Sequence, residues 1–151
     1  MKTLKQHIFE KLKVSAKNTT KHTLFPETKI ELKEMIEDEI FENGNECSLN
    51  HINVSKITNM SNLFRYSKFN GDISEWNVSN AKTMEGMFWG SNFNGDISNW
   101  DVSNVTNMYC MFYDSKFNGN ISNWDVSSVR DMYGMFASSP LEDNPPKWYK
   151  R

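Results

Sequence analysis

Cysteine and histidine are scarce in this sequence, and both shortages argue against particular kinds of site. The two cysteines, Cys47 and Cys110, stand in no C-x-x-C pattern, so we predict free thiols. The three histidines, His7, His22 and His51, are never at ligand spacing from one another or from a cysteine. The sequence also contains no glycine-rich phosphate loop, nucleophile elbow or Ser/His/Asp set. We therefore expect a chain that is not an enzyme and that uses no metal and no cofactor.

A strong net charge and a long apolar run are missing as well. The formal net charge is −2, so no global basic field favours nucleic acid as a partner. No apolar stretch reaches the roughly 18 residues of a membrane-spanning helix. No secretion signal or lipobox cysteine is visible near the start. We therefore favour a cytoplasmic or virion-associated localisation over secretion.

Charge is distributed unevenly along the chain. Residues 1–22 carry six lysines against one glutamate, and residues 23–46 carry eight acids against two lysines. The first interpretation is a solvated tail followed by the acidic face of a helix. The second is a basic docking peptide that binds an acidic partner.

Tryptophan recurs every 24 residues, and a whole segment of sequence recurs with it. Residues 73–79, 97–103 and 121–127 share the pattern Ile-Ser-x-Trp-x-Val-Ser. A fixed period in this range is typical of stacked repeats, in which every unit needs the same filler. We predict that the recurring apolar residues form the core: Trp76, Trp100, Trp124, Trp148, Met84, Met108, Met132, Phe64, Phe88, Phe112 and Phe136.

The spacing within one unit predicts a strand followed by a short helix. Residues 97–102 fit the L-x-x-L-x-L opening of a leucine-rich repeat, and residues 105–112 follow the three- and four-residue spacing of a helix. Ser103 is placed to cap that helix, and Asn-Gly pairs such as Asn94-Gly95 are expected to supply positive φ for the return turn. The predicted fold class is therefore α/β: a right-handed, leucine-rich-repeat-like solenoid of about four strand–helix units.

Both ends of the repeat array are expected to be closed. A helix from about Pro26 to Phe41, ended by Gly44, would cover the first unit. Pro145 and Pro146 lack the amide donors of a strand, so they would close the other end as a Pro-Pro-x-Trp plug. The predicted divisions are a basic tail or docking peptide (1–22), a capping helix (23–46), a four-unit solenoid (47–139) and a C-terminal cap (140–151).

These units resemble a known family. The pattern Ile-Ser-x-Trp-Asp-Val-Ser-Asn-Val-Thr-Asn-Met-x-x-Met-Phe, with Phe-Asn-Gly-Asp-Ile-Ser, is similar to BspA-like leucine-rich repeats, specifically the short Trp/Met-rich repeats of bacterial surface proteins and lipoproteins. The resemblance covers about residues 25–150 and includes the closing Asn144–Lys150. It implies a non-enzymatic binding module, of a kind often linked with adhesion to host or matrix proteins.

Positions that vary between units are the candidates for function, because the core does not dictate them. Two columns contain large residues: Arg65, Trp89 and Tyr113 in one, and Tyr109 and Tyr133 in the other. Aromatic residues on free surface positions are typical of protein-contact patches. The alternative is incidental packing against the turn of the adjacent unit.

Two columns of acidic and amide residues also recur, Asp72/Asp96/Asn120 and Asn77/Asp101/Asp125. Stacked carboxylates hold calcium in some repeat proteins. Because each column mixes Asp with Asn, we favour polar turn positions over a metal site.

Two functions remain open at this point. The first is a protein–protein interaction module whose partner is another protein. The second is a structural or assembly component of a larger complex, such as a phage virion, docked through residues 1–22.

Overall fold

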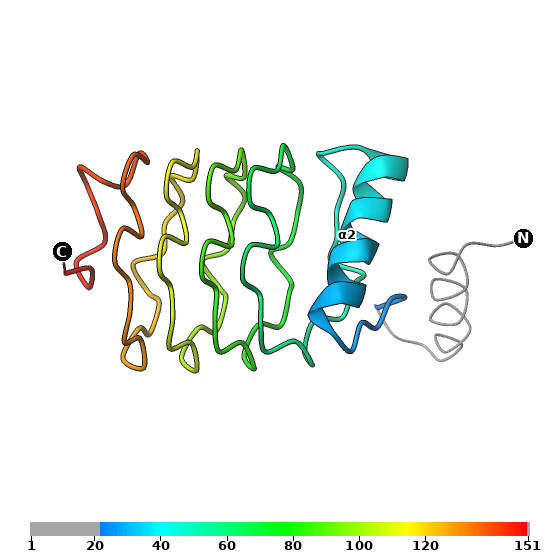
Figure 1. Ribbon diagram of the computed structural model, residues 1–151, viewed down its shortest axis with the longest axis horizontal. Coiled ribbons are helices and arrows are strands. Elements are labelled where there is room, and N and C mark those ends of the chain that lie inside the picture. Colours follow the sequence, from blue (N-terminus) through cyan, green and yellow to red (C-terminus); the bar gives the residue numbers. More distant parts are fainter. Residues whose placement is uncertain (1–21, 151) are drawn as a thin grey trace, which may run out of the picture.

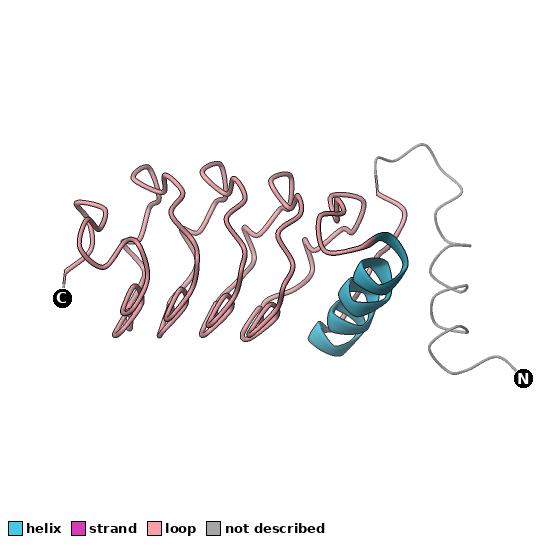
Figure 2. Ribbon diagram, turned by 90° about the horizontal axis from the view of Figure 1, so that it is seen from above, coloured by secondary structure: helices cyan, strands magenta, loops and turns pink. Residues whose placement is uncertain are grey.

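The computed structural model describes residues 22–150, which form a row of similar coils stacked along one axis (Figures 1 and 2). We number the four coils in chain order as residues 49–72, 73–96, 97–120 and 121–139. Within the described residues, the one helix is α2, Lys29–Asn43, and the backbone pairing between coils consists of isolated parallel bridges without named strands. Except for His22, the tail predicted at residues 1–22 lies outside the described residues.

Helix α2 begins at a complete N-terminal cap. Thr28 Oγ1 accepts a hydrogen bond from Glu31 N–H at 3.2 Å, and the Glu31 carboxylate accepts from Thr28 N–H at 3.3 Å. This reciprocal capping box satisfies two amides that a helix leaves free. At the other end, the Gly44 N–H donates to Ile40 O at 2.8 Å. The helix buries Leu32, Met35 and Ile36 in the same apolar cluster as the coils, and it covers one end of the stack (Figure 1).

The predicted α/β solenoid of strand–helix units is wrong. Residues 105–112, expected to be helical, run into consecutive turns in which Cys110 has a φ of +50°, and Gly86, at the equivalent place in the second coil, has a φ of +56°. An α-helix needs negative φ throughout. The expected strand, residues 97–102, is also interrupted, because the Trp100 N–H turns back to Ile97 O at 3.2 Å. The three- and four-residue apolar spacing therefore reflects turns that point side chains inward, not a helix.

Hydrogen bonds between coils replace the expected bonds within a helix. Each coil contains a series of consecutive turns, which we call its turn run, such as residues 84–90 of the second coil. In the turn runs of the first three coils, every second N–H donates to a carbonyl of the next coil, and we refer to this set of bonds as the ladder. Its donors in the second coil are Met84, Gly86, Phe88 and Gly90, and its acceptors in the third are Asn107, Tyr109, Met111 and Tyr113. Donation always runs toward the C-terminal coil, so the two ends of the ladder differ chemically.

The tryptophans also join neighbouring coils. Trp100 Nε1 donates to Ile73 O of the preceding coil at 3.1 Å, and Trp76, Trp124 and Trp148 make the equivalent bond. Trp148 continues the column beyond the fourth coil, since its ring stacks on Trp124 at 6.5 Å. In the first coil, Ile52 occupies the position equivalent to Trp76, and it is fully buried.

Phenylalanine rings form the rest of the core. Phe64, Phe88 and Phe112 stack nearly parallel at 5.4–5.5 Å between centroids, and Phe136 follows at 5.9 Å. Of the residues predicted for the core, Met132 and Trp148 are half-buried and the others are buried. The half-buried pair lies in and beyond the fourth coil, where no further coil covers the stack.

Two local expectations are also wrong. Ser103 does not cap a helix, because none follows it; instead its N–H and Oγ both donate to Asp101 Oδ1, at 3.0 and 2.6 Å. The glycines of the Asn-Gly pairs, Gly71, Gly95 and Gly119, do not adopt positive φ. At those positions glycine is required by close contacts, which are considered in the Discussion.

Candidate binding surface

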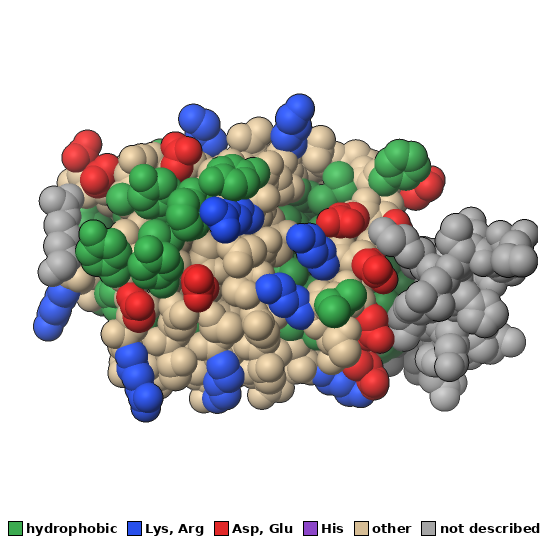
Figure 3. Space-filling view, viewed as in Figure 1, with side chains coloured by type: hydrophobic (Ala, Val, Ile, Leu, Met, Phe, Trp, Pro, Cys, Tyr) green, Lys and Arg blue, Asp and Glu red, His purple; other side chains and the backbone are tan. Residues whose placement is uncertain are grey.

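The turn runs place the variable residues on one face of the stack. Each coil has a small residue with positive φ in its turn run, such as Gly86, Cys110 or Gly134. The position equivalent to Tyr109 directly precedes this residue in the sequence, and the position equivalent to Arg65 follows it by three residues. Because successive coils stack in register, each variable position forms a column along the surface. Figure 3 shows apolar side chains gathered toward one end of this face, with acidic side chains on both sides.

The structure brings the five predicted contact residues together. The Arg65 guanidinium carbon lies 4.2 Å from the centre of the Trp89 ring, and Trp89 lies 4.9 Å from Tyr113. In the parallel column, Tyr109 and Tyr133 stack at 6.1 Å. Tyr133 is 77% exposed. We call these five residues the aromatic surface.

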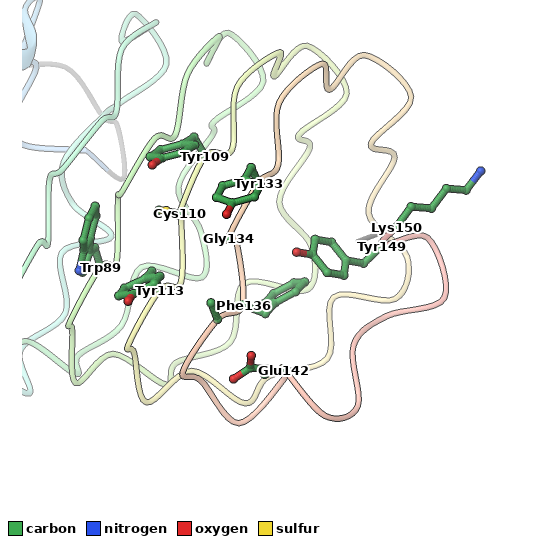
Figure 4. A pocket seen from close by; sticks show the side chains of 11 residues that line it. Trp89, Tyr109, Cys110, Tyr113, Tyr133, Gly134, Phe136, Glu142, Tyr149 and Lys150 are labelled. Atoms are coloured by element: carbon green, nitrogen blue, oxygen red, sulfur yellow. The ribbon is translucent and has the colours of Figure 1, made fainter.

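A pocket of about 570 Å³ opens at the C-terminal end of the aromatic surface (Figure 4). Trp89, Tyr109, Tyr113 and Tyr133 line it, together with Phe136 and Tyr149. The cavity exists because the fourth coil has Gly134 and Ala137 where the third has Cys110 and Tyr113. We call this cavity the end pocket.

Six residues that line the end pocket were not predicted as site or core residues: Gly134, Ala137, Cys110, Glu142, Tyr149 and Lys150. The first two carry a signal in the repeat itself, since each is smaller than its counterpart one unit earlier. Glu142 and Tyr149 follow the last regular unit, so no column marks them. The pocket wall at Tyr149 depends on an edge contact with Phe136, at 4.9 Å, which only the three-dimensional arrangement reveals.

Cys110 and Cys47 are free thiols in the structure. Burial raises the pKa of the Cys110 thiol, and the nearby carboxylates Asp131 and Glu85 raise it further. Burial is also the main cause of the raised pKa of Cys47. Raised pKa values keep both groups in the thiol form, which is a poor nucleophile.

The recurring carboxylates serve the turns. Asp96 Oδ1 accepts from Ser98 N–H at 2.9 Å and from Ser98 Oγ at 2.7 Å, as Asp101 does from Ser103. Such side-chain turns are a common role of Asp and Asn in loops. Among residues 22–150, no group of three potential metal ligands lies close enough to hold an ion.

Because carboxylates accept these hydrogen bonds, we predict that acid lowers the stability of the fold and that replacing the carboxylates with amides reduces this loss. The pKa values of Asp96, Asp101 and Asp125 are lowered; the Ser98 N–H is the main cause for Asp96, and the hydroxyl of the serine two residues on is the main cause for the other two. A lowered folded pKa adds stability above the unfolded value of about 3.9. That stability is lost as the pH falls through the folded pKa.

The triple variant Asp96→Asn, Asp101→Asn, Asp125→Asn should therefore lose less stability than the wild type between neutral and acidic pH. Asparagine keeps the turn, because Asn77 Oδ1 accepts from Ser79 N–H and Oγ at 3.1 and 2.6 Å. The measurement is the free energy of urea unfolding at pH 7 and at about pH 3. An equal loss in both proteins would contradict the assignment.

Comparison with known proteins places the chain in a family. A family model described as "Mycoplasma protein of unknown function, DUF285" matches residues 30–148. The chain belongs to this family. The DUF285 match begins within α2 and ends at Trp148, so it spans the described coils. No curated protein and no solved structure matches the chain. Over the part of the chain that the structure describes, no helix has the length and apolar character needed to cross a membrane.

Proposed function

We propose that this DUF285 chain is a non-enzymatic module that binds another protein through its aromatic surface. The observation that carries the proposal is the convergence of Trp89, Tyr109, Tyr113 and Tyr133 around one open pocket. Aromatic side chains that surround a pocket are typical of the residues that dominate protein interfaces.

The positions of these residues in the repeat support the same function. Each occupies a slot whose residue varies between units and is not aromatic in all of them, so packing of the coils does not require an aromatic side chain there. The sequence resemblance to BspA-like leucine-rich repeats, whose members are binding modules, also favours this proposal.

The test is a variant in which Trp89, Tyr109, Tyr113 and Tyr133 are all serine. It should fold and bind its partner about 30-fold more weakly, because losing an aromatic hot spot costs at least about 2 kcal/mol. Immobilised wild type and variant are exposed to an extract of the native source, the retained proteins are identified by mass spectrometry, and their affinities are measured.

A matched control replaces four exposed residues elsewhere on the coils with serine: Lys82, Asn99, Lys116 and Asn123. The control should retain the partner as the wild type does. If the four-serine variant folds and binds the partner with unchanged affinity, the aromatic surface is not the binding site.

An assembly component is the second candidate. It is favoured by the composition of residues 1–22, which contain six lysines and one acidic residue, Glu10. Deletion of residues 1–22 should then prevent incorporation into the complex without unfolding the coils.

A further inference from the structure

The hydrogen-bond partners differ between the two ends of the ladder. At the N-terminal end, Lys29 Nζ of α2 donates to Ser61 Oγ of the first coil at 2.7 Å. At the C-terminal end, the Ser138 N–H donates to Glu142 Oε2 at 2.8 Å. The equivalent amides of Gly134 and Phe136 donate to no carbonyl of the described residues. Two ladder donors are thus left beside the end pocket.

The end pocket also interrupts an aromatic column. Arg65, Trp89 and Tyr113 follow one another along the stack, and Ala137 leaves the next place empty. Within this column a cation already lies over an aromatic face, since the Arg65 guanidinium covers Trp89. A second cationic side chain over Tyr113 would repeat that arrangement.

Charge at the pocket favours a basic occupant. Of the lining residues, Glu142 and Lys150 are charged, and Figure 4 shows Glu142 at one edge of the cavity and the Lys150 ammonium directed away from it. Asp131 and Glu85 lie close enough to raise the pKa of Cys110, and Arg65, which lowers it, is engaged with Trp89. The chain itself contains a segment of the opposite charge, residues 1–21, whose lysines are Lys2, Lys5, Lys11, Lys13, Lys17 and Lys21.

The position of this segment in the chain favours binding between copies. The described chain begins at the α2 end of the stack, where the Thr23 N–H donates to His51 O of the first coil (Figure 1), and the end pocket, lined by Tyr133, Phe136 and Tyr149, lies toward the other end. To reach its own pocket, the segment would have to run back along all four coils.

We propose that the end pocket binds the lysine-rich segment, residues 1–21, of a second copy of this chain and so joins copies head to tail. A lysine fills the place beside Ala137 and faces Tyr113 and Glu142, and backbone carbonyls of the segment accept from Gly134 and Phe136. The inference rests on the proposed function, because the pocket is part of the aromatic surface. A head-to-tail contact is heterologous, so copies add in a row, or in a ring where the rotation between copies closes.

Sedimentation velocity of the full chain tests the inference. The mean mass should rise with concentration at low salt and fall back toward the monomer at high salt, because exposed charge pairs are screened. Ala137→Tyr should abolish the rise by filling the pocket with the ring that Tyr113 supplies one coil earlier. Asn123→Tyr adds the same ring at an exposed position outside the pocket and should associate as the wild type does.

The segment is tested in the same way. A variant with all six lysines of residues 1–21 changed to Gln should remain monomeric, and the variant with six arginines should associate. An equal mixture of the Ala137→Tyr and six-Gln proteins should form a heterodimer and stop there, because it contains one intact pocket and one intact segment. Binding of the segment to its own pocket would instead leave the wild type monomeric at every concentration.

Three results overturn the inference: a wild type that stays monomeric, a mixture that stays monomeric, or a folded Ala137→Tyr protein that associates like the wild type. If Ala137→Tyr fails to fold, Glu142→Gln replaces it, since Gln retains an acceptor for Ser138 N–H; association should then weaken about tenfold at low salt. The proposed function fails separately, when the four-serine variant still binds its partner.

Discussion

Trp100→Ala should destabilise the chain by roughly 3–5 kcal/mol. The side chain is 4% exposed, its ring stacks on Trp76 at 6.4 Å, and it lies 6.3 Å from Phe88 of the preceding coil. Truncation leaves a cavity between the second and third coils and removes the Trp100 Nε1 donor from Ile73 O, which keeps the Trp76 N–H at 3.2 Å. The measurement is the midpoint and slope of urea unfolding followed by circular dichroism.

Trp100→Phe separates the two contributions. It keeps a stacked ring and removes the Nε1 donor, so its cost should be close to that of one buried hydrogen bond plus some lost contact area, about 1–2 kcal/mol. Asn99→Ala, at the exposed neighbouring position, should change stability by less than about 0.5 kcal/mol. An unchanged midpoint in Trp100→Ala would show that the column does not hold neighbouring coils together.

The column positions could be read from the sequence because a fixed period marks them directly. Every unit repeats Trp, Met and Phe at the same places, so burial of residues such as Trp76 and Phe88 follows from stacking alone. Helix α2 could also be anticipated: its acidic first turn, its apolar stripe and Gly44 are local signals, and the structure begins the helix three residues after Pro26.

The conformation within each unit could not be read in the same way. Met84, Met87 and Phe88 have the spacing of a helix face, but their chain takes positive φ at Gly86 and Gly90 and donates every second amide to the next coil. Apolar spacing reports which side chains point inward and does not report where the amides go. Gly86, inside the supposed helix, was the available warning, because glycine costs about 1 kcal/mol there relative to alanine.

The aromatic surface could likewise be predicted from the repeat pattern only in part. Comparing units identified Arg65, Trp89 and Tyr113 as free positions in register, which is enough to place them near one another. The end pocket was not anticipated, because it depends on what is missing at Ala137 and on Tyr149, a residue beyond the regular units.

The glycine of the first Asn-Gly pair gives the second large effect, and its cause differs from the one expected from the sequence. A Cβ on Gly71 would lie 1.9 Å from Cys47 O and 2.9 Å from Cys47 C. These atoms belong to backbone that is itself fixed, since the Asp72 N–H donates to Cys47 O at 3.2 Å and the Asn70 N–H to Asn45 O at 2.8 Å. Neither side can move without breaking the junction between α2 and the first coil.

Gly71→Ala should therefore cost roughly 3 kcal/mol, at the upper end of the range for overpacking. Gly119→Ala should cost less, because the contacts of its Cβ are with the Phe117 ring alone, at 2.7–2.8 Å for the nearest atoms. Gly44→Ala is the conformational control: its φ is +86° but the space beside it is open, so only backbone strain of about 1–2 kcal/mol is expected. The ranking is measured by urea unfolding of the three variants. If Gly44→Ala proved the most damaging, positive φ would outweigh close approach, and the Asn-Gly pairs would need a different explanation from the one that the coil junctions provide.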